Sequence, residues 1–297
     1  MNSRTNFDRQ RGLAAGVHAV IWVLIWVPLD GSVPWIADVS IRPFMAWMFL
    51  FIAWLLWCAL VAWVGRNPRG DFVTGLVYRG CQLYSRLVQH TTVVGGENLP
   101  RNVDAGPLIV VANHTAGVDP VLVQAACVFE IRWMMGSDMM HPAMNPFWTY
   151  FRMIGVNRLG RDTASAKEAI RHVNGGGVLG IFPEGGIEKP YGQLMPFMAG
   201  VGLIVARTKA PVLPIFIAGT PQSDSAFGSL AKPGHASLTV GALMSFDGVP
   251  AAEVVKRVQA WFEVHARHEA RPGERLAISV ASQEHRAVSD GSLDLVR

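Results

Sequence analysis

The sequence predicts an α/β fold: a mixed, largely parallel sheet flanked by helices, preceded by an N-terminal transmembrane helical hairpin. Three observations support this prediction. From residue 107 to 268, apolar runs of strand length alternate with segments of helical periodicity, which is typical of β-α-β units. The first 70 residues contain two long apolar segments. Seven of the ten tryptophans lie in the first 65 residues, as expected beside a bilayer interface.

The composition indicates that part of the chain avoids water. Of the 297 residues, 51% are hydrophobic and only 16% are charged, against about 25% charged in a typical soluble protein. The net charge of +4 is modest, and no dense Lys/Arg run is interleaved with aromatics, so no nucleic-acid partner is expected. Its three cysteines have neither disulfide nor zinc spacing, and we expect no metal or other cofactor.

The anchor is expected within residues 1–70. Residues 43–65 are 23 consecutive residues without a charge, and about 20 apolar residues span the hydrocarbon. Residues 13–29 are shorter and include His18 and Pro28, so this segment fits a second span, a re-entrant segment or a signal-peptide core. We favour an uncleaved hairpin, because Asp30-Gly-Ser-Val-Pro is a poor cleavage site.

Arginines on both sides of this hairpin predict its orientation. Positive charge is enriched on the cytoplasmic side of membrane proteins. The connector between the apolar segments has one arginine, whereas the flanks have seven: Arg4, Arg9, Arg11, Arg66, Arg69, Arg79 and Arg86. The expected location is therefore a bacterial-type inner (cytoplasmic) membrane, with the large C-terminal domain on the cytoplasmic side.

Residues 71–92 form an amphipathic segment with two open interpretations. Val73, Leu76, Leu83 and Leu87 recur at helical spacing, and Arg79 and Arg86 fall on the other side. The helix either lies in the membrane interface or packs on the following domain.

Residues 93–268 are expected to form the main domain. A strand that ends in a turn is predicted within 93–100, further strands at 107–112, 130–135, 178–182, 212–218 and 236–240, and helices at 121–129, 164–173, 200–208 and 251–268. Active sites of such folds gather at the carboxyl ends of the strands. The last segment, 269–297, is polar with mixed charge and is expected to be a poorly packed tail.

A histidine and an aspartate follow the buried strand at 107–112. In the loop Asn113 to Pro120, the Asp119 carboxylate can return to His114 and hold one imidazole nitrogen, leaving the other free to accept a proton. Such a base would activate a hydroxyl supplied by the substrate. On the pair alone, the favoured interpretation is an N-cap aspartate, followed by Pro120 in the first helical turn, beside a loop histidine.

Several ordered motifs resemble the glycerolipid acyltransferases, which include 1-acylglycerol-3-phosphate acyltransferases. Gly96–Pro100 resembles the family's lead-in strand and turn, and four blocks follow: Asn113–Asp119 with its His-x4-Asp pattern, Gly155–Arg161, Phe182–Gly185 and Val212–Ile215. Together they cover roughly residues 93 to 219. Four blocks in the right order and spacing are far more specific than any single block.

This resemblance implies an acyltransferase (EC 2.3.1 class) of phospholipid biosynthesis. His114 would be the general base and Asp119 its orienting partner. The substrate-binding residues would be Arg158, Arg161, Glu184, Gly185, Gly186 and Pro214, with Arg161 on a phosphate and Glu184 accepting from an acceptor hydroxyl. The implied partners are membrane lipids, a lyso-lipid acceptor, and acyl-CoA or acyl carrier protein as donor substrate.

The third block departs from the family pattern. Thr or Ser and then Arg often follow the Phe-Pro-Glu-Gly core, whereas Gly186 and Ile187 stand here, so one expected anion donor is missing. Acyl transfer to a non-phosphate lyso-lipid, such as a lyso-ornithine lipid, therefore remains an alternative. Two others use the same scaffold: thioester hydrolysis by water, and lipid binding without turnover.

Overall fold

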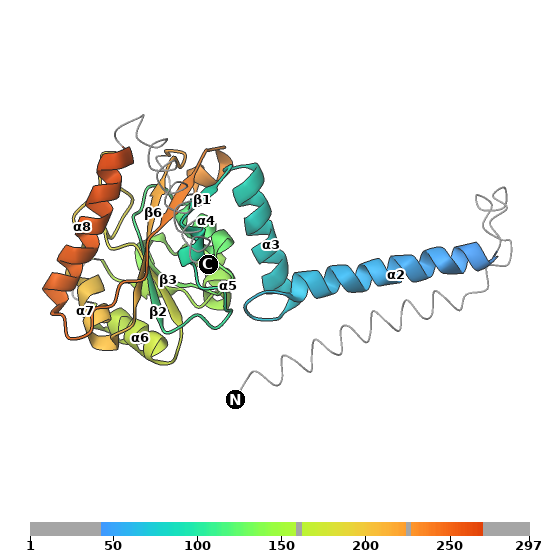
Figure 1. Cartoon of the computed structure of the whole chain (residues 1–297), viewed down its shortest axis with the longest axis horizontal. Helices are drawn as coiled ribbons and strands as arrows, with labels where there is room; N and C mark the ends of the chain where they lie inside the picture. The colour runs from blue at the N-terminus through green and yellow to red at the C-terminus, as the bar shows by residue number, and fades with distance from the viewer. Residues whose placement is uncertain (1–42, 159–161, 224–226, 270–297) are drawn as a thin grey trace, which may run out of the picture. The chain divides into compact units, whose positions relative to one another are not determined.

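The computed structural model describes residues 43–158, 162–223 and 227–269 (Figure 1). The chain divides into two compact units, with the division between Leu76 and Val77. The prediction of a mixed, largely parallel sheet flanked by helices is confirmed for the second unit.

Of the predicted anchor, the structure describes the helix α2, Pro43–Gly65. Among the described residues it alone is long and apolar enough to cross a membrane. The predicted span at 13–29, the arginines that precede it, and the tail from residue 270 lie outside the described residues.

Helix α3, Phe72–Leu87, presents its apolar side to solvent. The side chains of Val73, Leu76, Leu83 and Leu87 are all more than half exposed. The opposite side is buried and polar, with Thr74, Tyr78 and Ser85 among its residues. The helix contacts the domain through Tyr78 and Tyr84, whose hydroxyls donate to the carbonyls of Cys127 and Leu230. Its apolar face stays exposed, which fits the interfacial interpretation.

The main domain is built on a seven-stranded sheet with the order β1-β7-β6-β2-β5-β3-β4. Neighbouring strands are parallel except β6 and β7. The strands are β1 Thr92–Val94, β2 Leu108–Ala112, β3 Arg132–Gly136, β4 Ile154–Val156, β5 Val178–Ile181, β6 Val212–Ala218 and β7 Ser237–Val240. Strand β2 is central and fully buried, so its carboxyl end is the middle of the sheet's edge.

Helices cover both faces of this sheet. They are α4 Asp119–Ala126, α5 Asn145–Tyr150, α6 Thr163–Asn174, α7 Ala199–Thr208 and α8 Ala251–Glu269, with short 3-10 turns η1 Gly96–Asn98, η2 Ser137–Met139, η3 Pro142–Met144 and η4 Gly228–Ala231. Figure 1 shows α6, α7 and α8 on one side of the sheet and α4 on the other. Successive side chains of β2 alternate between the two resulting cores: Ile109 and Val111 face α6 to α8, and Val110 faces α4.

Three details of the sequence analysis need correction. The short elements β4 and α5 were not predicted. The helix expected at 121–129 begins earlier, at Asp119, and ends at Ala126. Asp119 is therefore the first helical residue, and Val118 occupies the N-cap position without a side-chain hydrogen bond.

Candidate active site

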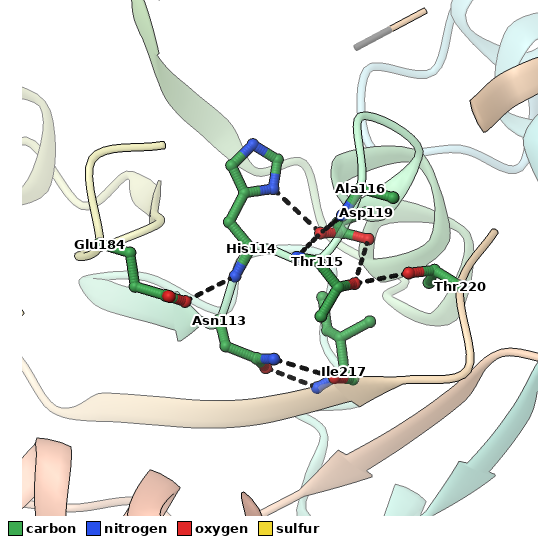
Figure 2. A network of polar contacts seen from close by, with 8 residues as sticks. All are labelled: Asn113, His114, Thr115, Ala116, Asp119, Glu184, Ile217 and Thr220. Atoms are coloured by element: carbon green, nitrogen blue, oxygen red, sulfur yellow. Dashed lines mark hydrogen bonds and ion pairs between the residues drawn. The ribbon is translucent and has the colours of Figure 1, made fainter. Parts of the chain in front are cut away.

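The site begins where β2 ends. The Asn113 side chain continues the pairing between β2 and β6: its Nδ2 donates to the Ile217 carbonyl (2.9 Å), and its Oδ1 accepts from the Ile217 amide (2.7 Å) (Figure 2). Asn113 is buried. These two bonds fix the backbone immediately before His114, so the histidine starts from a rigid strand end rather than a free loop.

His114 and Asp119 form the predicted pair. The imidazole Nδ1 lies 2.9 Å from Asp119 Oδ2. The Asp119 side chain is fully buried, while that of His114 is 18% exposed. An ionised carboxylate can only accept, so Nδ1 carries the proton and Nε2 presents a lone pair. Figure 2 shows the rest of the ring directed away from Asp119, an arrangement suited to a general base.

The Asp119 carboxylate is held by the loop that it closes. Oδ2 also accepts from the backbone amides of Thr115 (2.7 Å) and Ala116 (2.9 Å). Oδ1 accepts from the Thr115 hydroxyl (3.1 Å), which lies 2.6 Å from the hydroxyl of Thr220 (Figure 2). The carboxylate thus bonds back to residues before α4, which explains why it does not cap the helix. Sequence reasoning gave no signal for Thr220.

Glu184 joins the site through the backbone of His114. Its Oε1 accepts from the His114 amide (2.8 Å), and its Oε2 accepts from the Met195 amide (2.9 Å). Burial raises the pKa of Glu184 to about 7, and the two amides only partly offset this. The sequence interpretation placed an acceptor hydroxyl on this carboxylate. In the structure both oxygens are engaged by backbone amides, and that role stays a prediction.

Glu188 is a site residue that the sequence analysis missed. Its backbone amide donates to the His114 carbonyl (2.8 Å), so His114 is held on its amide side by Glu184 and on its carbonyl side by Glu188. The Glu188 carboxylate is buried and accepts from the Gly192 amide (2.7 Å). Burial raises its pKa, the Gly192 amide opposes this, and the Asp119 charge adds to it. No motif marks this residue.

Arg158 reaches the turn after β5. Its Nη1 donates to the Gly185 carbonyl (3.0 Å), and its Nε and Nη2 bind the Asp138 carboxylate. Gly185 has a φ of 73°, and a Cβ there would lie 2.5 Å from the Met198 sulfur, so glycine is required. An added Cβ on the predicted neighbour Gly186 would lie 3.7 Å from Arg158 Nη1. Asp138 was not anticipated.

One predicted site residue, Pro214, is not brought to the His114–Asp119 pair. Pro214 is buried inside β6, paired with Val111 and packed close to Gly241 and Trp261. It lies three residues before Ile217, about 10 Å along the strand from the sheet edge. Arg161 lies outside the described residues. Within the ranges that the structure describes, no group of three or more His, Cys, Asp or Glu is arranged to hold a metal ion.

The raised pKa of Glu184 predicts a pH-dependent stability. The unfolded carboxyl ionises near 4.5, whereas the folded one keeps its proton up to a pKa of about 7. The folded state therefore binds more protons in this window, and stability falls as pH rises through it. Between pH 5 and 8 the wild type should lose about 2 kcal/mol more stability than Glu184→Gln, which cannot ionise.

Unfolding of the detergent-solubilised protein at both pH values measures this difference. Glu97→Gln changes an exposed glutamate and should follow the wild type. Equal losses in the wild type and Glu184→Gln would contradict the raised pKa.

Comparisons with known proteins agree with the motifs. Residues 90–218 match the protein-family model Acyltransferase. Among solved structures, the fold is similar to the crystal structure of PlsC, the 1-acyl-sn-glycerophosphate (LPA) acyltransferase from Thermotoga maritima. The TM-score is 0.57 at 23% identity, covering 75% of this chain and 94% of that one. No curated protein matches the sequence.

The family match includes the residues that build the site. His114 and Asp119, the turn from Phe182 to Gly185, and β6 all lie within residues 90–218. The described fold supplies the parallel sheet whose edge carries these residues. Residues 90–218 are therefore an acyltransferase domain and the chain is an acyltransferase, in agreement with the glycerolipid acyltransferase motifs that the sequence carries.

Proposed function

We propose that this enzyme transfers a fatty acyl group from acyl-CoA or acyl carrier protein to the hydroxyl of a lysophospholipid such as 1-acylglycerol 3-phosphate. The observation that carries the proposal is the His114–Asp119 pair, bonded at 2.9 Å at a sheet edge with the histidine partly exposed. The PlsC structure, titled as a 1-acyl-sn-glycerophosphate acyltransferase, has a similar fold and motivates the choice of acceptor.

In the proposed reaction, His114 Nε2 takes the proton of the acceptor hydroxyl. The hydroxyl oxygen attacks the thioester carbonyl, so a carbon–oxygen bond forms and the carbon–sulfur bond breaks. The imidazolium then protonates the departing thiolate, which restores the base. Asp119 stabilises the imidazolium between these steps, and the enzyme needs no covalent nucleophile of its own.

We further propose that the reaction takes place at the cytoplasmic face of the membrane. Helix α2 is long and apolar enough to span a bilayer. Helix α3 begins seven residues after α2 ends, and its exposed apolar side suits the boundary between head groups and acyl chains. A lipid acceptor would then reach the enzyme from the membrane itself.

A lyso-lipid without phosphate is the second candidate acceptor. Gly186 and Ile187 provide no cation where the family often has one. Arg158, which could bind a phosphate, is already paired with the Asp138 carboxylate. Both observations reduce the positive charge available around the Gly185 turn.

An acceptor panel tests the proposal and separates the two candidates. Membranes containing the protein receive labelled acyl-CoA, or labelled acyl carrier protein, with 1-acylglycerol 3-phosphate, a zwitterionic lysophospholipid or a lyso-ornithine lipid. We expect label in the phosphate-bearing acceptor. Arg161→Ala should raise the KM for this acceptor more than for a neutral one. Label only in the lyso-ornithine lipid would replace the first candidate by the second.

The same assay detects the remaining alternatives. Free fatty acid without labelled lipid would indicate thioester hydrolysis. If neither free fatty acid nor labelled lipid forms with any acceptor, the protein does not turn over the thioester. The membranes are compared with membranes that contain His114→Ala, so that label transferred by other enzymes is subtracted.

A further inference from the structure

Three aromatic rings form a continuous stack that ends on the proposed base. The Phe182 ring lies 4.2 Å from the His114 ring, with 18° between their planes. On its other side, Phe182 lies 4.8 Å from the Trp133 ring at 10°. Three nearly parallel rings at these separations leave the imidazole little freedom to tilt on the Phe182 side.

The sheet places these rings by its register. Trp133 of β3 pairs with Gly180 of β5, and Phe182 follows two residues later, so both side chains stand on the same face. A Cβ at position 180 would lie 2.4 Å from the indole ring. Glycine at 180 is therefore what lets a buried tryptophan lie flat against the sheet and reach Phe182.

The stack and the polar contacts constrain His114 in different ways. Glu184 and Glu188 hold its backbone, and Asp119 fixes one ring nitrogen. A single hydrogen bond still allows the ring to rotate about the bond axis. The Phe182 face removes this freedom, and an aromatic face also attracts the positive imidazolium that forms during proton transfer.

We propose that Phe182, supported from behind by Trp133, is a positioning residue that holds the His114 imidazole in the plane in which Nε2 meets the acceptor hydroxyl. This inference rests on the proposed function for its catalytic consequence. Its structural part, the orientation of the ring, is independent of which acceptor the enzyme uses. Neither aromatic residue is proposed to touch a substrate.

The stack also predicts a difference in the chemical reactivity of His114. The titratable groups that face His114 are Asp119 at the start of α4, and Glu184 and Glu188 in the loop after β5. All three remain when Phe182 is replaced. Loss of the Phe182 ring uncovers one face of the imidazole, so a reagent should reach the ring more readily in Phe182→Leu than in the wild type.

The test compares Phe182→Leu, Phe182→Tyr and the control Phe129→Leu in the full-length protein. Phe129 is fully buried in the same core but is not part of the stack, so its leucine variant reports the general cost of losing a core ring. We expect Phe182→Leu to lower kcat about 10-fold with little change in KM. Phe182→Tyr should restore most of this loss, and Phe129→Leu should keep wild-type kinetics.

A second measurement needs no turnover. Diethyl pyrocarbonate modifies imidazole, and peptide mass spectrometry follows the modification of His114 alone at one fixed pH. In Phe182→Leu this modification should be several-fold faster than in the wild type, because the Phe182 ring no longer covers one face of the imidazole, and in Phe129→Leu it should keep the wild-type rate. Equal behaviour of the two leucine variants in both assays would overturn the inference. Faster modification in Phe182→Leu without acyl transfer in the wild type would instead contradict the proposed function.

Discussion

Replacing His114 by alanine is expected to lower acyl transfer by about 10²–10⁴-fold, the range that a positioned general base contributes. The chain should still fold, because the backbone amide and carbonyl of His114 keep their bonds to Glu184 and Glu188. Initial rates of label transfer to the preferred acceptor measure the effect. Thermal unfolding of the purified variant shows whether the fold survives.

A histidine on the other face of the sheet provides the control. His265 in α8 packs against Trp261 and Phe216, on the face of the sheet opposite α4. His265→Ala should keep the wild-type rate within a few fold. Near wild-type turnover by His114→Ala would show that His114 is not the general base.

Replacing Asp119 by asparagine is expected to lower kcat by roughly 10²-fold or more while the loop keeps its shape. The amide oxygen can take the place of Oδ2 and accept from His114, Thr115 and Ala116. The amide nitrogen can donate to the Thr115 hydroxyl, which then donates to Thr220. What disappears is the negative charge that stabilises the imidazolium.

Asp119→Ala tests the structural role of the same residue. It leaves the Thr115 and Ala116 amides without their acceptor, so this variant should be less stable as well as inactive. Asp247→Asn, which removes an exposed charge beside Lys209, is the matched control and should leave the rate unchanged. Full activity in Asp119→Asn, with thermal unfolding like the wild type, would show that the charge is not needed.

The sequence predicted correctly those features that depend on a single strand or a single motif. The apolar run at 107–112 predicted β2 within one residue, and the loop that follows it predicted the His114–Asp119 contact. Each depends on residues close together in the chain. The family blocks added Glu184, whose carboxylate accepts from the His114 amide, and Gly185, which lies in the same turn after β5.

The rest depended on contacts between distant residues. Elements β4 and α5 have three and six residues, too few for a periodic pattern, and β4 contains a glycine. Glu188 and Asp138 look like ordinary surface acids until the loop after β5 folds over His114 and meets Arg158. The ring stack required the register between β3 and β5, which a single sequence does not reveal.

The outward-facing leucines of α3 have a practical consequence for handling the enzyme. A chain shortened to begin at residue 71 would lose the long apolar helix and still carry Leu76, Leu83 and Leu87 on its surface. Such a fragment would bind detergent, or aggregate in buffer without detergent. A catalytic domain that stays monomeric in solution therefore requires polar residues in place of those leucines, in addition to the deletion of residues 1–70.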